Sequence, residues 1–189
     1  MHLSKDSSNV RRNRMNSLTR KWLFLLLIVL AVLVVDQVTK HLVLANLRLG
    51  ESDVPIPALY PLFQITRSEN TGAAFGFLSQ TGDLFLIIAL VIVVVMLVFY
   101  PRVSDKAHLT QFAIGLVVGG ALGNAFDRVS NGAVIDFIHY QIPGLVSNVS
   151  NLADHAIVVG VLIIVAQSWH NDPAKAPEVE EEKSGENRS

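Results

Sequence analysis

Long apolar segments separated by polar stretches dominate the 189-residue chain. A helix needs about 20 predominantly apolar residues to cross the hydrocarbon core of a bilayer. The first segment reaches that length only if it includes Asp36 and Lys40. The pattern predicts a membrane all-α fold, a four-transmembrane-helix bundle with spans at 22–44, 84–100, 108–126 and 151–169.

Composition agrees with a membrane protein, because 51% of the residues are hydrophobic and only 16% are charged. Soluble domains carry about 25% charged residues. We expect one membrane domain over 22–169, between a disordered basic arm at 1–21 and a disordered acidic tail at 170–189. The chain has no cysteine, which excludes disulfides, thiolate metal sites and cysteine nucleophiles.

The first apolar segment has an alternative interpretation as a cleaved secretory signal peptide. It has a basic start, an apolar core and a possible cleavage site at 43–45. Asp36, Lys40 and His41 would lie between that core and the cleavage site, where such polar residues are unusual. We therefore favour an uncleaved span.

The distribution of basic residues predicts the orientation of the spans. Lysines and arginines precede the first span, and Arg102 and Lys106 lie between the second and third. The positive-inside rule places both segments and both termini in the cytoplasm. The loops at 45–83 and 127–150 then lie outside, and alternating residues at 62–66 predict a strand in a small β-containing outer cap.

With this orientation, the unusual polar residues all lie at one level, near the outer ends of the spans. Buried charges in a bilayer are costly, and they persist where they are paired or functional. This clustering predicts a functional site at the outer face. Its candidate residues are Asp36, Lys40, Asn70, Asn124, Asp127, Arg128, Asp136, Asn151 and Asp154.

Several of these residues also have a purely structural interpretation. Asp36 and Lys40 have the i,i+4 spacing of an ion pair on one helix face. Asn151 could be an N-cap, with Asp154 completing a capping-box-like arrangement. Arg128 is expected to neutralise a nearby carboxylate.

Glycines in the third span indicate close helix packing. Gly115, Gly119 and Gly123 form overlapping GxxxG spacings in an apolar helix. We expect this packing to bring the polar end of the third span against the fourth.

Asp136 and Asp154 point to aspartyl peptidase chemistry. Asp136 is flanked by apolar residues, which is not typical of a solvated loop carboxylate. Two close carboxylates share one proton, so one can activate a water molecule while the other protonates the scissile carbonyl. The sequence does not say which aspartate does which.

Other interpretations of the polar residues are weaker. His139 and His155 could bind zinc with the two aspartates, but the HExxH spacing is absent. Ser150 and His155 could belong to a serine hydrolase, but there is no GxSxG elbow. A small proton-coupled transporter would need polar residues that continue inward. A non-catalytic assembly subunit would leave Asp136 and Asp154 unexplained. The basic arm is better explained by membrane topology than by nucleic-acid binding.

Five segments, in this order, resemble the lipoprotein signal peptidase (signal peptidase II) family, and the resemblance extends over residues 22–169. One departure is Ser150, where the family usually has an aromatic residue. The segments are 36–40 (DQVTK), 70–75 (NTGAAF), 119–128 (GGALGNAFDR), 134–137 (VIDF) and 151–154 (NLAD).

The resemblance implies a fold of four helices with an outer β-cradle. It implies that Asp136 and Asp154 are the catalytic dyad and that residues such as Asn70, Asn124 and Arg128 support the dyad or bind the substrate backbone. The implied substrate is a prolipoprotein with a diacylglyceryl-modified cysteine, cut just before that cysteine, and the implied inhibitor is the cyclic peptide globomycin. No metal or cofactor is implied, and we expect a monomer in the bacterial cytoplasmic membrane, in contact with its lipids.

Overall fold

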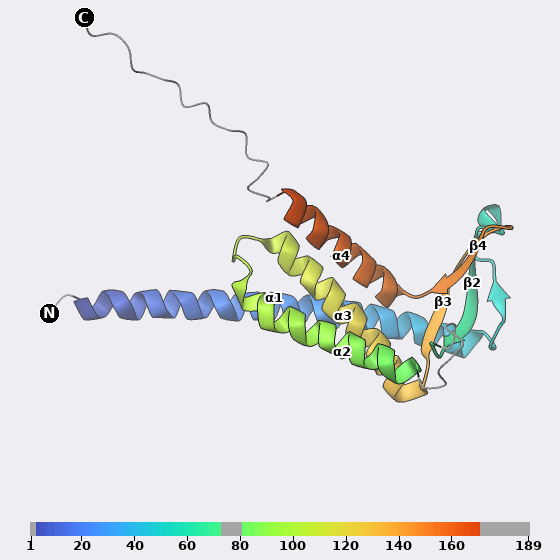
Figure 1. Cartoon of the computed structure of the whole chain (residues 1–189), viewed down its shortest axis with the longest axis horizontal. Coiled ribbons are helices and arrows are strands. Elements are labelled where there is room, and N and C mark those ends of the chain that lie inside the picture. The colour runs from blue at the N-terminus through green and yellow to red at the C-terminus, as the bar shows by residue number, and fades with distance from the viewer. Residues whose placement is uncertain (1–2, 73–80, 171–189) are drawn as a thin grey trace, which may run out of the picture.

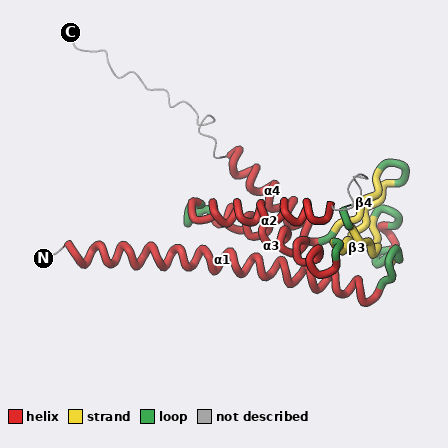
Figure 2. Tube along the Cα trace, turned by 60° about the horizontal axis from the view of Figure 1, so that its bottom comes forward, coloured by secondary structure: helices red, strands yellow, loops and turns green. Residues whose placement is uncertain are grey.

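The computed structural model describes residues 3–72 and 81–170, with side chains from residue 17 onward and without those of 81–83. Within these residues, helices lie at one end and a small sheet at the other (Figures 1 and 2). The helices are α1 (Leu3–Asn46), α2 (Thr81–Phe99), α3 (His108–Asn131) and α4 (Leu152–His170), with short 3-10 turns η1 (Pro57–Leu59) and η3 (Tyr100–Arg102). The strands are β1 (Ser52–Asp53), β2 (Phe63–Asn70), β3 (Val134–Ile142) and β4 (Val146–Ser150).

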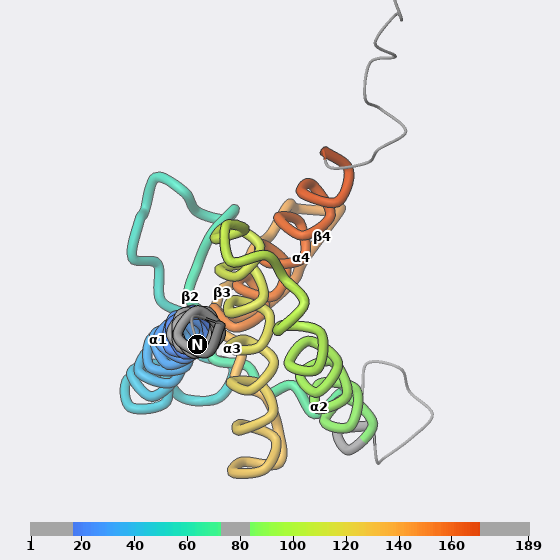
Figure 3. Tube along the Cα trace, turned by 90° about the vertical axis from the view of Figure 1, so that its left-hand side faces the viewer, coloured from blue at the N-terminus to red at the C-terminus, as the bar shows by residue number. Residues whose placement is uncertain are grey.

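Among the described residues, four helices are long and apolar enough to cross a membrane. The central one is α3, because 67% of its apolar window is buried, against 11% in both α2 and α4. The end-on view shows α3 between the other three helices (Figure 3). The other helices direct large apolar side chains outward, as a lipid-facing surface requires.

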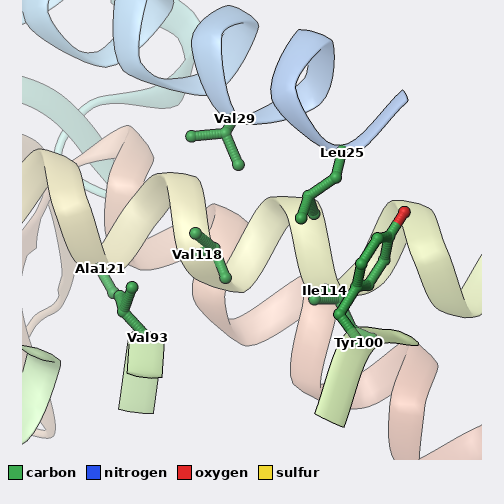
Figure 4. Packing of buried hydrophobic residues seen from close by; sticks show 7 residues of the cluster. All are labelled: Leu25, Val29, Val93, Tyr100, Ile114, Val118 and Ala121. Carbon is green, nitrogen blue, oxygen red and sulfur yellow. The ribbon is translucent and has the colours of Figure 1, made fainter. Parts of the chain in front are cut away.

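The bundle core forms where α1, α2 and α3 meet. Figure 4 shows its side chains, which include Leu25 and Val29 from α1, Val93 from α2, and Ile114 and Val118 from α3. These side chains fill the space between the helices, and they lie in the half of the bundle away from the sheet. Apart from Lys21 and Gln111 at the far end of the bundle, the buried polar and charged side chains lie nearer the sheet.

Glycines allow α3 to approach α1 and α4 closely. The packing differs in part from the prediction that these glycines bring the third span against the fourth. A methyl group on Gly115 or Gly119 would clash with Ile28 or Val32 of α1, and one on Gly123 would lie 2.7 Å from the Oδ2 atom of Asp36. The GxxxG face thus packs mainly against α1 rather than α4. The neighbouring Gly120 contacts the backbone of α4, because it lies on the adjacent face of the helix.

The spans predicted from sequence correspond to the four helices, with different ends. α3 continues to Asn131, beyond the predicted end at 126, because the first residue able to stop it is Gly132. Gly132 has a φ of 72° and caps the helix through its N–H, which donates to the Arg128 carbonyl. Asp127 and Arg128 therefore lie on the last turns of α3.

The arm predicted to be disordered at 1–21 is helical from Leu3 as the first part of α1, since neither proline nor glycine interrupts residues 3–46. The predicted acidic tail lies outside the described residues, apart from His170.

The sheet is antiparallel with strand order β1-β2-β3-β4. The strand predicted at 62–66 is confirmed as part of β2. The segment 127–150 was expected to be a loop carrying Asp136, but Asp136 lies inside β3. The reason is that β3 pairs with the distant β2, with Ser68 opposite Asp136, and this pairing is not visible in the local pattern. We call residues 47–72 and 132–150 the cap.

Candidate active site

Asp136, on β3 of the cap, is held by two asparagine side chains. Its Oδ1 accepts a hydrogen bond from Asn151 Nδ2 at 2.6 Å, and its Oδ2 accepts one from Asn70 Nδ2 at 3.1 Å. The carboxyl is only 3% exposed. Burial raises the pKa of Asp136 to about 6; the hydrogen bond from Asn70 opposes this shift, and the negative charge of Asp154 adds to it.

Asp154 is positioned by the start of α4. The Asn151 side chain accepts from the Asp154 N–H at 2.9 Å, and the Asp154 carboxylate accepts from the Asn151 N–H at 3.3 Å. These reciprocal bonds form the predicted capping box. The positive end of the helix dipole also favours a carboxylate at this position.

Two asparagines connect the two aspartates. Asn124 Nδ2 donates to Asp154 Oδ1 at 2.7 Å, and Asn151 Nδ2 donates to both Asn124 Oδ1 and Asp136 Oδ1. Asn151 is fully buried and Asn124 nearly so. The amides therefore fix both carboxyl groups relative to one another, although the aspartates come from different elements.

A buried ion network lies behind these amides. Lys40 Nζ lies 2.8 Å from Asp36 Oδ2 and 2.7 Å from Asp127 Oδ2, and it donates to Asn124 Oδ1 at 3.1 Å. The predicted pair of Asp36 and Lys40 is thus confirmed. Asp36 Oδ1 also accepts from the Ala153 N–H, so the network joins α1, α3 and the first turn of α4.

Arg128 forms no direct ion pair with any carboxylate that the structure describes, although its charge interacts with those of Asp154, Asp136 and Asp127 at longer range. Among the described residues, no carboxylate oxygen lies within ion-pairing distance of its guanidinium. Its Nη1 donates to the carbonyl of Asn124 at 3.2 Å, and its guanidinium lies over the Phe85 ring. Lys40 neutralises Asp127 instead, because it approaches from α1, a contact that depends on tertiary packing.

The two aspartates border one cavity of about 480 Å³ between the cap and α4. Asn70, Tyr140, His155 and residues of β4 also line it. A second cavity, of about 350 Å³, lies between α2, α3 and α4. Its walls are mostly apolar, and Asn124 and Arg128 contribute polar groups to them.

The histidines considered for zinc binding have other partners. His139 bonds through its two ring nitrogens to Thr66 and Ser147, within the sheet. His155 lies 2.6 Å from the Asn151 carbonyl through Nδ1 and 3.2 Å from the Tyr140 hydroxyl through Nε2, rather than bonding Ser150. In the described part of the chain, no group of three or more histidines, aspartates and glutamates could hold a metal ion.

Two residues at the site were not predicted. Gln37 donates to Asp127 Oδ1 at 2.9 Å and to Asp36 Oδ2 at 3.1 Å. Its polar side chain in an apolar span was a usable signal. Tyr140 lies four residues after Asp136 in β3, and alternate strand residues share a face, so only the recognition of β3 as a strand could have identified it.

Comparison with known proteins identifies the family. The family described as Signal peptidase (SPase) II matches residues 28–170. A lipoprotein signal peptidase of Staphylococcus haemolyticus is 39% identical over 140 residues, covering 74% of this chain and 87% of the relative. The chain belongs to the signal peptidase II family.

Other similar proteins agree with this membership. A lipoprotein signal peptidase of Photorhabdus laumondii is 39% identical over 163 residues, covering 84% of this chain and 93% of the relative. A bacterial membrane enzyme solved by the in meso method at 1.9 Å has a TM-score of 0.71 at 35% identity, covering 78% of this chain and 93% of that one. This signal peptidase II family member is therefore a multi-pass membrane protein of a peptidase family.

Proposed function

We propose that the protein is an intramembrane aspartyl endopeptidase that removes signal peptides from prolipoproteins, with Asp136 and Asp154 as the catalytic dyad. The single observation that carries this proposal is that both carboxyl groups line one cavity and are joined through Asn151 and Asn124. Membership in the signal peptidase II family supports the substrate class.

In the proposed mechanism the dyad shares one proton. The ionised carboxylate takes a proton from a water molecule, and the water oxygen bonds to the scissile carbonyl carbon. The protonated carboxyl donates to the carbonyl oxygen. When the tetrahedral intermediate collapses, the C–N bond breaks and a proton goes to the leaving amine, which leaves a carboxylic acid on the signal peptide.

The raised pKa of Asp136 supports this sharing. A carboxyl with a pKa of about 6 holds its proton at a pH at which an ordinary aspartate has lost it. The negative charge of Asp154 contributes to this raised pKa of Asp136, so the two carboxyl groups interact. The surrounding amides provide hydrogen bonds without adding competing charge.

The proposed substrate carries a diacylglyceryl group on a cysteine, and cleavage occurs just before that cysteine. Its acyl chains would stay in the leaflet beside the cap, so the scissile bond would reach the dyad at the membrane surface. The apolar cavity between α2, α3 and α4 could accept a lipid or signal-peptide segment. Arg128 also lines this cavity, and its Nε is buried and has no partner among the described residues, so it could donate to a substrate carbonyl there. Globomycin would compete for this site.

The proposed orientation places both termini in the cytoplasm and the dyad at the outer face. It is supported by the contact between the two basic segments. Lys21 Nζ lies 3.2 Å from Asp105 and donates to the carbonyl of Val103 in the loop before α3. Trp22 packs edge-on against Tyr100 at the same end, as interfacial aromatics do.

The transporter alternative gains no support from the described helices. A proton relay needs polar groups along the whole path. Between Trp22 and Asp36, α1 has only apolar residues, and α3 has only apolar residues and glycine between Gln111 and Asn124. A monomer stays our expectation.

The test is cleavage of a diacylglyceryl-modified prolipoprotein by purified wild type, Asp136→Asn and Asp154→Asn. Mass spectrometry would locate the cut. We expect wild type to cut before the lipidated cysteine and both variants to lose cleavage while keeping the wild-type melting temperature. Cleavage by both variants would disprove the dyad, and a folded wild type that never cuts would disprove the substrate assignment.

A further inference from the structure

One edge of the cap exposes a group of large apolar side chains. Leu145, in the turn between β3 and β4, is 81% exposed, and Tyr60 is 62% exposed. Monomeric soluble proteins rarely expose large contiguous apolar patches without a partner. We call this group the apolar rim; it consists of Ile56, Leu59, Tyr60, Leu62, Ile142, Leu145 and Val146.

The two segments of the rim belong to one structural unit. The backbone N–H of Gln141 donates to the Leu62 carbonyl at 3.0 Å, so the segment before β2 lies against the end of β3. Ile142 pairs with Val146 across the β3–β4 hairpin. The rim is therefore one end of the sheet, where β2 starts and β3 ends, rather than a set of scattered residues.

The rim is uncharged, and the opposite edge of the cap is not. Residues 54–66 and 137–150 contain no aspartate, glutamate, lysine or arginine. Apart from Asp136, the charged residues of the cap lie beside β1 and the second half of β2, where Arg67 pairs with Glu69 at 2.8 Å. Those charged residues are Arg48, Glu51, Asp53, Arg67 and Glu69.

A short strand, β4, joins the rim to α4, a helix with exposed apolar side chains. Figure 1 shows β2 and β3 running across the direction of α1 at one end of the bundle, with the β3–β4 turn pointing away from the helices. β4 is followed directly by Asn151, the N-cap of α4, so no linker separates the hairpin from this span. Because the five residues of β4 extend at most about 17 Å, Val146 at the start of β4 lies within about that distance of α4.

We infer that the apolar rim inserts into the lipid leaflet on the cap side and that lipid, rather than another protein, covers it. Apolar residues with an interfacial tyrosine suit the boundary between headgroups and acyl chains. Because the rim has no basic residue, this contact does not need anionic lipid. It would brace β3, the strand that carries Asp136, against the membrane, and it does not depend on the peptidase proposal.

The experiment uses single spin labels on the full chain in vesicles. The chain has no cysteine, so Leu145→Cys and Tyr60→Cys each provide one labelling position without other changes. Leu49→Cys is the matched control, because Leu49 is 62% exposed like Tyr60 but lies beside Arg48 on the charged edge. Collision rates with oxygen, which dissolves in lipid, and with a water-soluble nickel chelate would be measured in phosphatidylcholine vesicles.

We expect labels at positions 145 and 60 to collide several-fold more with oxygen, relative to nickel, than the label at 49. The result should be the same with and without phosphatidylglycerol. Equal ratios at all three positions would overturn the inference. A preference for oxygen over nickel at positions 145 and 60 that requires anionic lipid would also overturn it. So would a low nickel collision rate that appears only at high protein-to-lipid ratio, since that would mean that a second copy covers the rim.

Discussion

Asn124 donates a hydrogen bond to Asp154 across the interface of α3 and α4, with Nδ2 and Oδ1 2.7 Å apart. The same asparagine accepts bonds from Lys40 and Asn151 through its Oδ1. One side chain thus connects an aspartate of the proposed dyad both to the ion network of α1 and to the amide that holds Asp136. An amide side chain can make all these bonds because it has N–H donors and a carbonyl acceptor.

Asn124→Leu should lower kcat/KM about 10- to 100-fold, because hydrogen bonds to charged groups contribute about 1.5–3 kcal/mol each. Asp154 would lose the hydrogen bond from Asn124 while keeping the capping-box bonds with Asn151. Steady-state cleavage kinetics would measure the effect. Asn131→Leu, at an exposed position in the last turn of α3, is the control and should leave kcat/KM unchanged. Equal activity of the two variants would contradict a positioning role for Asn124.

Lys40→Met should destabilise the protein by about 3–5 kcal/mol, because two buried carboxylates would lose their only counter-ion in the described network. Unfolding in detergent, followed by circular dichroism, would report the loss. Lys106→Met, at an exposed position in the loop before α3, should change stability by no more than about 0.5 kcal/mol. A Lys40→Met variant as stable as that control would contradict the role of Lys40 as the counter-ion of Asp36 and Asp127.

The rate of cleavage should fall as the pH rises above about 6. Burial raises the pKa of Asp136 to about 6, so the dyad keeps its shared proton below that pH and loses it above. In the simplest case kcat/KM falls about tenfold per pH unit on the alkaline side. The pH profile of kcat/KM tests this expectation, provided that circular dichroism is constant over the same range. A profile that stays flat to about pH 8 would exclude the shared proton.

Tyr140 and His155 should contribute jointly to substrate binding. A carbonyl can only accept, so His155 Nδ1 must donate to Asn151, which leaves Nε2 to accept from the Tyr140 hydroxyl. Tyr140→Phe and His155→Ala should each raise KM about 2- to 10-fold with little change in kcat, and the double variant should be no worse than the worse single one.

Tyr60→Phe is the matched control for that cycle, since it removes a hydroxyl from an exposed tyrosine outside the cavity. It should leave KM unchanged. Additive effects of the two cavity substitutions would show that Tyr140 and His155 act separately.

Local sequence patterns were enough to predict the four apolar helices and the contacts between residues close in sequence. The apolar segments predicted each helix, because the bilayer requires a minimum length of apolar helix regardless of what packs against it. The capping box of Asn151 and Asp154 was also predictable, since its hydrogen bonds join residues three apart. The ion pair of Asp36 and Lys40 followed from helical spacing for the same reason.

Contacts between distant parts of the chain were decided only by tertiary structure. β3 is a strand because β2 pairs with it from about 70 residues away, so Asp136 looked like a loop residue. Asp127 is neutralised by Lys40 of α1 rather than by the adjacent Arg128, because helix packing sets which cation reaches it. Sequence alone thus predicted which polar residues would gather near one end of the helices, whereas their partners depended on how the helices and the sheet pack.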